Sequence, residues 1–294
     1  MGSKTWTIKD LLKVTTDYLK GKGIENPRLD SEVLLAHQLK GDRVSLYLNL
    51  DQPLTKEEIS GYRTSVRRRV QREPLQYITG VQEFWSLEFI VGPQALIPRP
   101  ESEMLVEHAI GLLKATGEER GHAPAILDVG TGCGTLAVSL ACEMEHATIR
   151  ATDISSTALE LARLNAEKHG VADRVAFLEG DLLKPIENLG LEFDVILSNP
   201  PYVASEEYEA LPPEIRDYEP RLALEGGQGG MYYVERIITE TPDYLIPGGW
   251  LLIEMAPNQT EESLKLVEQT GAYCEVSRKK DYAQHYRIVA AQKS

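Results

Sequence analysis

The sequence predicts an α/β fold in which a helical segment precedes a domain of parallel strands and crossover helices. Apolar residues recur at helical spacing through the first 75 residues, and strand-like runs alternate with helical patterns from Ile126 onward. An alternating aromatic segment between these two parts is typical of a β-hairpin. We therefore expect a helical domain, a hairpin linker and an α/β domain, which span residues 1–75, 76–95 and 96–294.

Three helices are expected in the first part. Apolar positions spaced by three and four residues indicate helices over 8–19 and over 31–39. Thr55 and Glu58 have the spacing of a capping box, so a third helix should begin there. That helix should end before Pro74, because the residue preceding a proline is pushed out of helical geometry. Its five arginines favour a solvated helix face.

The α/β domain should follow a hairpin that is bracketed by Gly80 and Gly92-Pro93. Alternation of strands and helices implies parallel strands, because each crossover helix returns the chain to the same strand direction. Helices are expected to start at Thr135 and Ser155, and strands to cover 126–129, 149–152, 175–178, 193–198, 250–254 and 286–290.

The composition is that of a soluble globular protein, with 294 residues of which 42% are hydrophobic and 26% charged. No run reaches the ~18 apolar residues that span a bilayer, and the N-terminus lacks the apolar segment of a signal peptide. We expect a cytoplasmic protein without membrane contact. The formal net charge of −14 repels phosphate, which argues against direct nucleic-acid binding and favours a basic partner.

The three cysteines form no CxxC pair, and the six histidines form no HExxH motif. These patterns argue against a disulfide framework and against a metal site. We therefore expect no metal and three ordinary buried thiols.

The segment Asp128-Val129-Gly130-Thr131-Gly132-Cys133-Gly134 lies between an expected strand and an expected helix. Glycines at such a turn let a ligand lie against bare backbone, and the N–H groups of the helix N-terminus face that ligand. Thr135 occupies the place of the third glycine of a dinucleotide motif, which weakens an NAD interpretation. A structural glycine turn is the alternative. We predict that the following residues contact a nucleotide-like cofactor: Gly130, Thr131, Gly132, Cys133 and Gly134.

Later positions extend this predicted cofactor site. Asp153 ends the next strand, 23 residues after Gly130, near the ~20-residue separation at which a carboxylate meets ribose hydroxyls. Its alternative role is to cap the helix that starts at Ser155. Past the third strand, Asp181 and Leu182 would present an acceptor and an apolar face to an adenine ring.

The apolar strand 193–198 ends abruptly in Asn199-Pro200-Pro201-Tyr202. Ligands of open α/β sheets gather at such strand ends. Asn199 Oδ1 and the Pro200 carbonyl would accept hydrogen bonds from a planar NH2 group, which the Tyr202 ring would stack against. The prolines would hold these acceptors rigid, and a cis-proline turn is the alternative. We predict a methyl transfer from S-adenosylmethionine to an amide or amine nitrogen, with Asn199, Pro200 and Tyr202 catalytic and all four residues binding the substrate.

Further motifs occur along nearly the whole chain: Pro74-Leu75-Gln76-Tyr77-Ile78-Thr79-Gly80, Phe84-Trp85, Leu96-Ile97-Pro98-Arg99-Pro100-Glu101-Ser102-Glu103, Glu219-Pro220, Ala223-Leu224, Gly226-Gly227 and Pro247-Gly248-Gly249. With these motifs the sequence resembles the HemK/PrmC family, the protein-(glutamine-N5) methyltransferases of peptide chain release factors. The resemblance implies a small helical domain that docks the substrate, a linking hairpin, and a seven-stranded Rossmann-like S-adenosylmethionine-dependent methyltransferase domain.

The same resemblance implies a substrate and roles for the predicted site residues. The substrate would be the glutamine of a Gly-Gly-Gln motif in class I release factors. Residues 130–134, Asp153 and Asn199 would bind S-adenosylmethionine, and Leu182 would lie by its adenine. Residues 199–202 would bind the glutamine amide.

The sequence departs from the family pattern at four positions, where Ser102 replaces Thr, Gly229 replaces Asp, and Ala256 and Gln284 replace Gly. Ser102 keeps the hydroxyl group. The other three lie in loops outside residues 199–202, so they bear on local geometry or partner docking.

Two other functions stay open at this point. Exocyclic NH2 groups of adenine or guanine have the same planar geometry, so an amino methyltransferase acting on nucleic acid is the alternative. A cofactor-binding module without catalysis, which would dock translation factors, is a third hypothesis. Gly226-Gly227-Gln228 repeats the substrate tripeptide of the family, and we interpret it as a turn rather than as a site of self-methylation.

Overall fold

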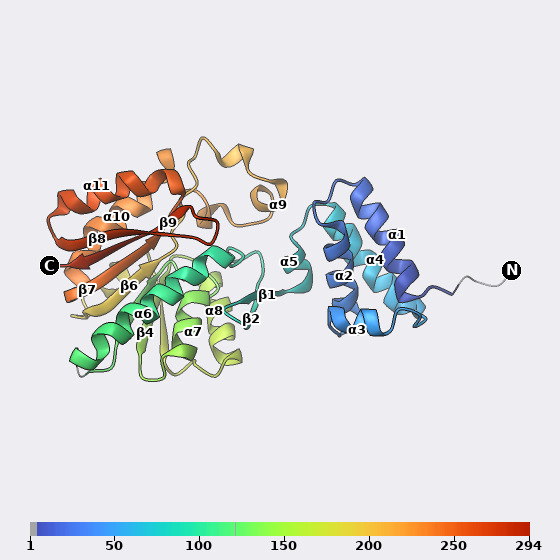
Figure 1. The fold of residues 1–294 in the computed structure, drawn as a ribbon, viewed down its shortest axis with the longest axis horizontal. Coiled ribbons are helices and arrows are strands. Elements are labelled where there is room, and N and C mark those ends of the chain that lie inside the picture. Colours follow the sequence, from blue (N-terminus) through green and yellow to red (C-terminus); the bar gives the residue numbers. More distant parts are fainter. Residues whose placement is uncertain (1–4, 121) are drawn as a thin grey trace. The chain divides into compact units, whose positions relative to one another are not determined.

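The computed structural model describes residues 5–120 and 122–294, with the side chains of 116–120 left aside. The described chain divides into two compact units (Figure 1). We call them the helical unit, which contains the chain up to Gly80 together with Pro213–Tyr218, and the sheet unit, which contains Val81–Pro212 and Glu219–Ser294. The boundaries 1–75, 76–95 and 96–294 stay a prediction, and a short helix occupies Leu75–Thr79 where the linker was expected to begin.

The helical unit consists of short helices around one apolar core. The core includes Leu12, Leu34 and Tyr62. Its helices are α1 (Ile8–Gly21), α2 (Pro27–Gln38), α3 (Arg43–Leu48), α4 (Lys56–Val70), α5 (Leu75–Thr79) and α9 (Pro213–Arg216). The predicted capping box is confirmed, because the Glu58 backbone N–H donates to Thr55 Oγ1 over 3.2 Å and the Thr55 N–H donates to the Glu58 carboxylate over 2.7 Å. Helix α2 begins four residues earlier than expected, since Pro27 suits a first helical turn.

The prediction of a solvated arginine face on α4 is wrong for part of the helix. Arg69 is buried, and it donates to Asp30 over 2.6 Å and to Glu214 over 3.3 Å. Arg72 also donates to Glu214, over 3.1 Å. A buried guanidinium needs such partners because desolvation of an unpaired charge is costly. Arg63 and Arg67 are exposed, as expected.

The predicted hairpin is present as an antiparallel pair, β1 (Val81–Phe84) and β2 (Leu87–Ile90). Its two turn residues, Trp85 and Ser86, have φ values of +53° and +57°. Two consecutive residues with positive φ match the twist of the flanking strands, although glycine or asparagine is the usual choice there.

The sheet unit contains a seven-stranded sheet in the order β5-β4-β3-β6-β7-β9-β8, which confirms the predicted fold class. Strand β9 is antiparallel to both of its neighbours, and the other paired strands are parallel. The strands are β3 (Ala125–Val129), β4 (Thr148–Asp153), β5 (Val175–Glu179), β6 (Phe193–Ser198), β7 (Leu245–Glu254), β8 (Tyr273–Lys280) and β9 (Tyr286–Lys293). The helices are α6 (Glu103–Arg120), α7 (Thr135–Glu143), α8 (Ser156–Lys168), α10 (Tyr232–Glu240) and α11 (Thr260–Thr270). Short 3-10 turns cover Pro100–Ser102, Lys184–Ile186, Tyr208–Ala210, Arg221–Ala223, Gln228–Gly230, Thr241–Tyr244 and Pro257–Gln259.

Helices cover both faces of this sheet (Figure 1). Helices α6, α7 and α8 lie on one face, and α10 and α11 on the other. Every residue of β6 is buried, as expected for a central strand between two helical layers. The chain leaves β3 toward β4 and later returns to β6 on the other side of β3, so a ligand crevice is expected at the carboxyl ends of β3 and β6.

The expectation of three buried thiols is corrected here. Cys133 is buried, but Cys142 and Cys274 are exposed, so only one of the three thiols fits the prediction. Strand β8 was not expected.

Among the helices that the structure describes, none has the length and apolar character of a membrane span.

Candidate active site

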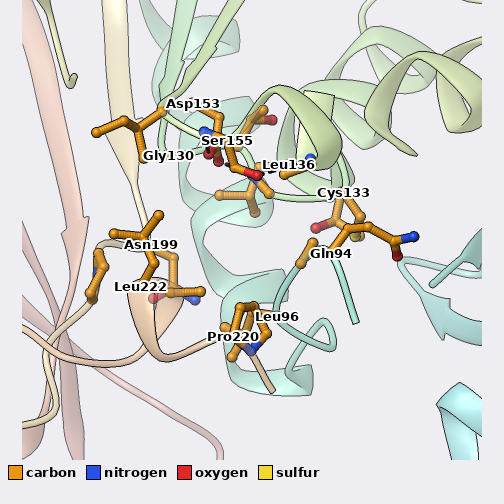
Figure 2. Close-up of a pocket in the computed structure, with 18 of the residues that line it drawn as sticks. Gln94, Leu96, Gly130, Cys133, Leu136, Asp153, Ser155, Asn199, Pro220 and Leu222 are labelled. Atoms are coloured by element: carbon orange, nitrogen blue, oxygen red, sulfur yellow. Dashed lines mark hydrogen bonds between the residues drawn. The ribbon is translucent and has the colours of Figure 1, made fainter. Parts of the chain in front are cut away.

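A cavity opens at the carboxyl ends of β3, β4 and β6, where the three strands end near the same edge of the sheet (Figure 2). Most of the predicted site residues line it: Gly130, Thr131, Gly132, Cys133, Asp153, Leu182, Asn199 and Pro201. Gly134, Pro200 and Tyr202 are described by the structure but are not in that lining. Residues without a role assigned from the sequence supply much of the rest, among them Leu96, Pro98, Ser102, Leu136, Pro220 and Leu222.

The glycine loop, residues 130–134, follows β3 and needs its glycines for backbone conformation. Gly130, Gly132 and Gly134 have φ values of +76°, +58° and +86°, in the left-handed region that side chains rarely adopt. A Cβ on Gly134 would also lie 3.0 Å from the Cβ of Ala162 in α8. The Gly130 N–H donates to the Thr152 carbonyl over 2.8 Å, which fastens the loop to β4.

Asp153 holds the same loop from the end of β4. Its Oδ2 accepts a hydrogen bond from the Gly132 N–H over 2.8 Å, and its Oδ1 accepts one from the Ser155 N–H over 2.9 Å. Burial raises the pKa of Asp153. The N-cap of α8 is Ser155, whose hydroxyl accepts from the Ala158 N–H over 3.2 Å. The Asp153 carboxylate is therefore fixed at the cavity edge, with lone pairs left for a ligand hydroxyl.

Asp128 lies beneath the glycine loop and is fully buried. Its Oδ2 accepts hydrogen bonds from the Thr131 hydroxyl over 2.6 Å and from the Ala137 N–H over 3.2 Å. Its Oδ1 has no partner among the residues that the structure describes. Burial raises the pKa of Asp128 to about 7, and the nearby Asp153 charge adds to this shift.

The segment after β5 forms another part of the cavity wall. Leu182 has a φ of +51° and lines the cavity with its apolar side chain. Asp181 accepts from Arg236 over 3.0 and 3.1 Å, and it pairs with Lys184 over 3.0 Å. These cations, above all Arg236, lower the pKa of Asp181. Its carboxylate is therefore already engaged with two cations.

Residues 199–202, which we call the Asn-Pro-Pro-Tyr turn, follow β6. Asn199 Nδ2 donates to Ser102 Oγ over 2.9 Å, and the Ser102 hydroxyl donates to Glu254 Oε2 over 2.7 Å. Burial raises the pKa of Glu254 to about 7, although hydrogen bonds from Ser102 and Tyr202 work against that shift. Burial also raises the pKa of Tyr202. The described residues contain no cis peptide bond, so the alternative of a cis-proline turn is not observed.

A second group of residues braces the backbone of this turn. Gln259 Nε2 donates to the Tyr202 carbonyl over 2.8 Å and to the Gly229 carbonyl over 3.0 Å. A Cβ on Gly226 would lie 2.5 Å from the Pro201 carbonyl oxygen, so only glycine fits there. The repeat Gly226-Gly227-Gln228 thus has a packing explanation for its first residue.

Glu219 joins two further parts of the cavity wall. It accepts a hydrogen bond from the Ile97 N–H over 3.0 Å and one from Arg99 over 2.5 Å. This connects the segment before α6 to the segment that leads to Pro220 and Leu222. Arg99 and Glu219 each belong to a motif that supports the family resemblance. These two motifs could have indicated from sequence that the segments before α6 and around Pro220 lie at the site.

The sheet order, the glycine loop after β3 and the polar turn after β6 define the class of protein. Among solved structures, the catalytic domain of hMettl16 in complex with the MAT2A 3′UTR hairpin 6 is similar, with a TM-score of 0.55 and 18% identity over 71% of this chain and 76% of that chain. At this identity the likeness concerns the fold alone. Because residues 102–215 also match the methyltransferase small domain model, the chain is an S-adenosylmethionine-dependent methyltransferase.

Comparison with known sequences narrows the class to a family. The PrmC N-terminal domain model matches residues 10–80, and the methyltransferase small domain model matches residues 102–215. The release factor glutamine methyltransferase of Geobacter sulfurreducens is 46% identical, over 92% of this chain and 91% of that protein. The release factor glutamine methyltransferase of Rhodopirellula baltica is 41% identical, over 98% of this chain and 97% of that protein. The chain belongs to the release factor glutamine methyltransferase family.

Proposed function

We propose that this protein methylates the side-chain amide nitrogen of the glutamine in the Gly-Gly-Gln motif of class I peptide chain release factors. One observation carries the assignment of the site. A neutral Asn199, whose amide is held by Ser102, lines the same cavity as the glycine loop and Asp153. The relatives match this chain over nearly their full length and are named release factor glutamine methyltransferases. These names support the proposed substrate.

The residues around the glycine loop suit S-adenosylmethionine. Left-handed glycines leave bare backbone for a ligand to approach, and the fixed Asp153 carboxylate would accept hydrogen bonds from the ribose diol. Leu182 and Leu136 would supply apolar surface, with Leu182 by the adenine. When bound, the cofactor supplies a sulfonium-activated methyl group that replaces one N–H hydrogen of the amide, with loss of a proton and of S-adenosylhomocysteine.

The Asn-Pro-Pro-Tyr turn would bind the glutamine amide. Asn199 Oδ1 and the Pro200 carbonyl would accept its two N–H hydrogen bonds and so orient the nitrogen lone pair. Such fixed acceptors stabilise the positive charge that grows on nitrogen during alkylation. An amide nitrogen is a poor nucleophile, so orientation and exclusion of water contribute more than a strong base would. The walls formed by Leu96, Pro98 and Leu222 suit the exclusion of water.

Tyr202 has a role in this proposal that differs from simple stacking. Its hydroxyl interacts with Glu254, which anchors the ring at its polar end. The ring, which is not part of the cavity lining, would then support the turn from behind the amide. The helical unit, most of which the PrmC N-terminal domain model matches, would dock the release factor.

The experiment uses purified full-length protein, S-adenosylmethionine and a class I release factor. Mass spectrometry of the peptide that contains Gly-Gly-Gln should show a gain of one methyl group on the glutamine. A release factor with this glutamine replaced by alanine is the matched control and should stay unmodified. Equal labelling of both release factors would overturn the proposal, and stronger labelling of RNA or DNA would favour the nucleic-acid alternative. A gain of one methyl on the enzyme's own Gln228, with cofactor alone, would revive self-methylation.

A further inference from the structure

We propose that Ser102 and Glu254 are positioning residues that fix which end of the Asn199 amide faces the substrate. They would act through a one-directional chain of hydrogen bonds, from Asn199 through Ser102 to Glu254. This inference rests on the proposed function, because it assigns a cause to the orientation that Asn199 needs in that reaction.

This chain of hydrogen bonds joins three separate segments of the sheet unit. Ser102 ends the short turn before α6, Asn199 follows β6, and Glu254 ends β7. The distance from Asn199 Nδ2 to Ser102 Oγ is 2.9 Å, and that from Ser102 Oγ to Glu254 Oε2 is 2.7 Å. Ser102 and Glu254 are 4% and 1% exposed, so water does not compete for these bonds. Among the described residues, the structure gives Asn199 Oδ1 no hydrogen-bond partner.

Counting protons determines the direction of the chain. An ionised carboxylate only accepts hydrogen bonds, and a serine hydroxyl has one proton to donate. Ser102 gives this proton to Glu254, so its oxygen must accept from the remaining neighbour. That neighbour, Asn199, therefore has to present its NH2 group to Ser102. Oδ1, at the other end of the planar amide, is left as the acceptor for the substrate nitrogen.

Reversal of this chain would oppose substrate binding. A neutral group at position 254 that donates to Ser102 would free the Ser102 proton, which would then go to Asn199 Oδ1. The amide would turn its NH2 group toward the substrate NH2, and two donors would face each other. The ionised state of Glu254 thus specifies an acceptor some distance away, without touching the substrate.

Several charged or titratable groups face Glu254 and set its ionisation. Arg287 on β9 and the Tyr202 hydroxyl favour the charged form, and Glu101 opposes it. Burial has the largest effect and raises the pKa of Glu254 to about 7. Protonation of Glu254 would therefore occur as the pH falls through about 7, and the hydrogen-bond chain would lose its direction there.

Variants of both residues test the inference in single-turnover methylation of a release factor with saturating cofactor. Glu254→Gln keeps the shape but allows both directions, and Ser102→Ala removes the link. We expect each to lower the rate at pH 8 by about 10-fold, less than the roughly 10²- to 10³-fold loss of a group that contacts the reacting atoms, because neither residue touches the substrate, while cofactor affinity stays within about twofold. Ser102→Thr keeps the hydroxyl and should retain most of the rate. Glu261→Gln, an exposed change on α11, is the matched control.

Two further readouts separate positioning from general structural damage. In the Ser102→Ala background, Glu254→Gln should cause no further loss, since residues that act in one chain are not additive. The wild-type rate should fall as the pH is lowered from about 8.5 to about 6, around the raised pKa, and Glu254→Gln should remove that part of the dependence.

The outcomes are distinguishable. If the wild type methylates the release factor and both variants keep its rate, or if the wild-type rate does not change over that pH range, this inference is overturned. The pH profile of the wild type provides this test even if a variant fails to fold. If the wild type leaves the release factor unmodified, the proposed function itself fails.

Discussion

The glycine loop and the Asn-Pro-Pro-Tyr turn follow neighbouring strands, β3 and β6, yet they are built in opposite ways. The glycine loop uses residues with positive φ and leaves backbone accessible to a ligand. The turn uses two prolines, which restrict the backbone and have no N–H group to donate. Backbone without side chains thus lies on one side of the cavity, and rigid acceptors lie on the other. A reaction between two ligands requires both kinds of surface at one place.

The two segments also differ in how they are supported. The glycine loop is fastened by residues close to it in sequence, through Thr152 and Asp153 of the next strand. The turn is supported by residues far from it in sequence, namely Ser102, Glu254 and Gln259. Substitutions around the turn should therefore affect the reaction from many positions, and substitutions around the loop should chiefly affect cofactor binding.

Loss of Asn199 should have the largest effect. Asn199→Ala removes one of two proposed acceptors for the substrate amide. We expect the turnover number to fall by about 10²- to 10³-fold, as when one oxyanion-hole donor is lost, with cofactor affinity changed by less than about threefold. Steady-state kinetics and isothermal titration calorimetry measure the two quantities. A loss of cofactor affinity equal to the loss of turnover would contradict the division between the two segments.

The buried Asp128 carboxyl beneath the glycine loop should make the free energy of unfolding depend on pH. Burial raises the pKa of Asp128 from 3.8 to about 7, so the folded chain holds this proton more tightly than the unfolded chain. The protonated Asp128 therefore contributes to the free energy of unfolding below about pH 4, and this contribution is lost as the pH rises through about 7.

Asp128→Asn cannot lose a proton and should escape that loss. Relative to the wild type, its free energy of unfolding should rise by roughly 2–4 kcal/mol between pH 4 and pH 8. Urea unfolding followed by circular dichroism at several pH values measures this. A difference between variant and wild type that stays constant over the range would show that Asp128 does not titrate there.

Asp153 provides the test of the cofactor side. Asp153→Ala removes the proposed acceptor for the ribose hydroxyls and the anchor of the Gly132 N–H. We expect cofactor affinity to fall by about 10- to 50-fold, since a charged hydrogen bond contributes about 1.5–3 kcal/mol, while turnover at saturating cofactor changes little. Asp173→Ala, at an exposed position, is the control and should bind the cofactor normally.

Two adjacent glycines allow a finer test of the support of the turn. Gly229 and Gly230 both have positive φ, +60° and +73°, so alanine is strained at either position. Only at Gly230 would a Cβ meet the Tyr202 carbonyl oxygen, at 2.1 Å, whereas the space around Gly229 is open. Gly230→Ala should therefore lower the free energy of unfolding by about 1–2 kcal/mol more than Gly229→Ala. Equal effects would mean that the close approach to Tyr202 contributes nothing.

The parts of the fold that could be predicted from sequence are those with local signals. Helix α4 begins where the capping box predicted, and β6 covers the predicted residues 193–198. Helix α3 was missed because it is short and buries only Leu46. Strand β8 was missed because its side chains are largely polar and partly exposed, so it is defined by pairing with β9 and not by an apolar pattern.

The same distinction applies to the site. The glycine loop and Asn199 could be found because each lies directly after a recognisable strand. The hydrogen bond from Ser102 to Glu254 joins residues 152 positions apart, and no spacing in the sequence predicts it. Arg69 shows the same limit, because only the folded chain brings Asp30 and Glu214 to it.

The segment Pro213–Tyr218 belongs to the helical unit, although the residues on both sides of it belong to the sheet unit. The polypeptide therefore passes between the units three times, at Gly80, at Pro213 and at Tyr218. Glu214 and Tyr218 bond to the residues just after α4, through Arg72 and the Gln71 carbonyl. A truncated chain that starts at Val81 would keep this segment but lose its partners. Likewise, after a proteolytic cut at Gly80, only noncovalent contacts such as that between Arg72 and Glu214 would hold the helical fragment to Pro213–Tyr218.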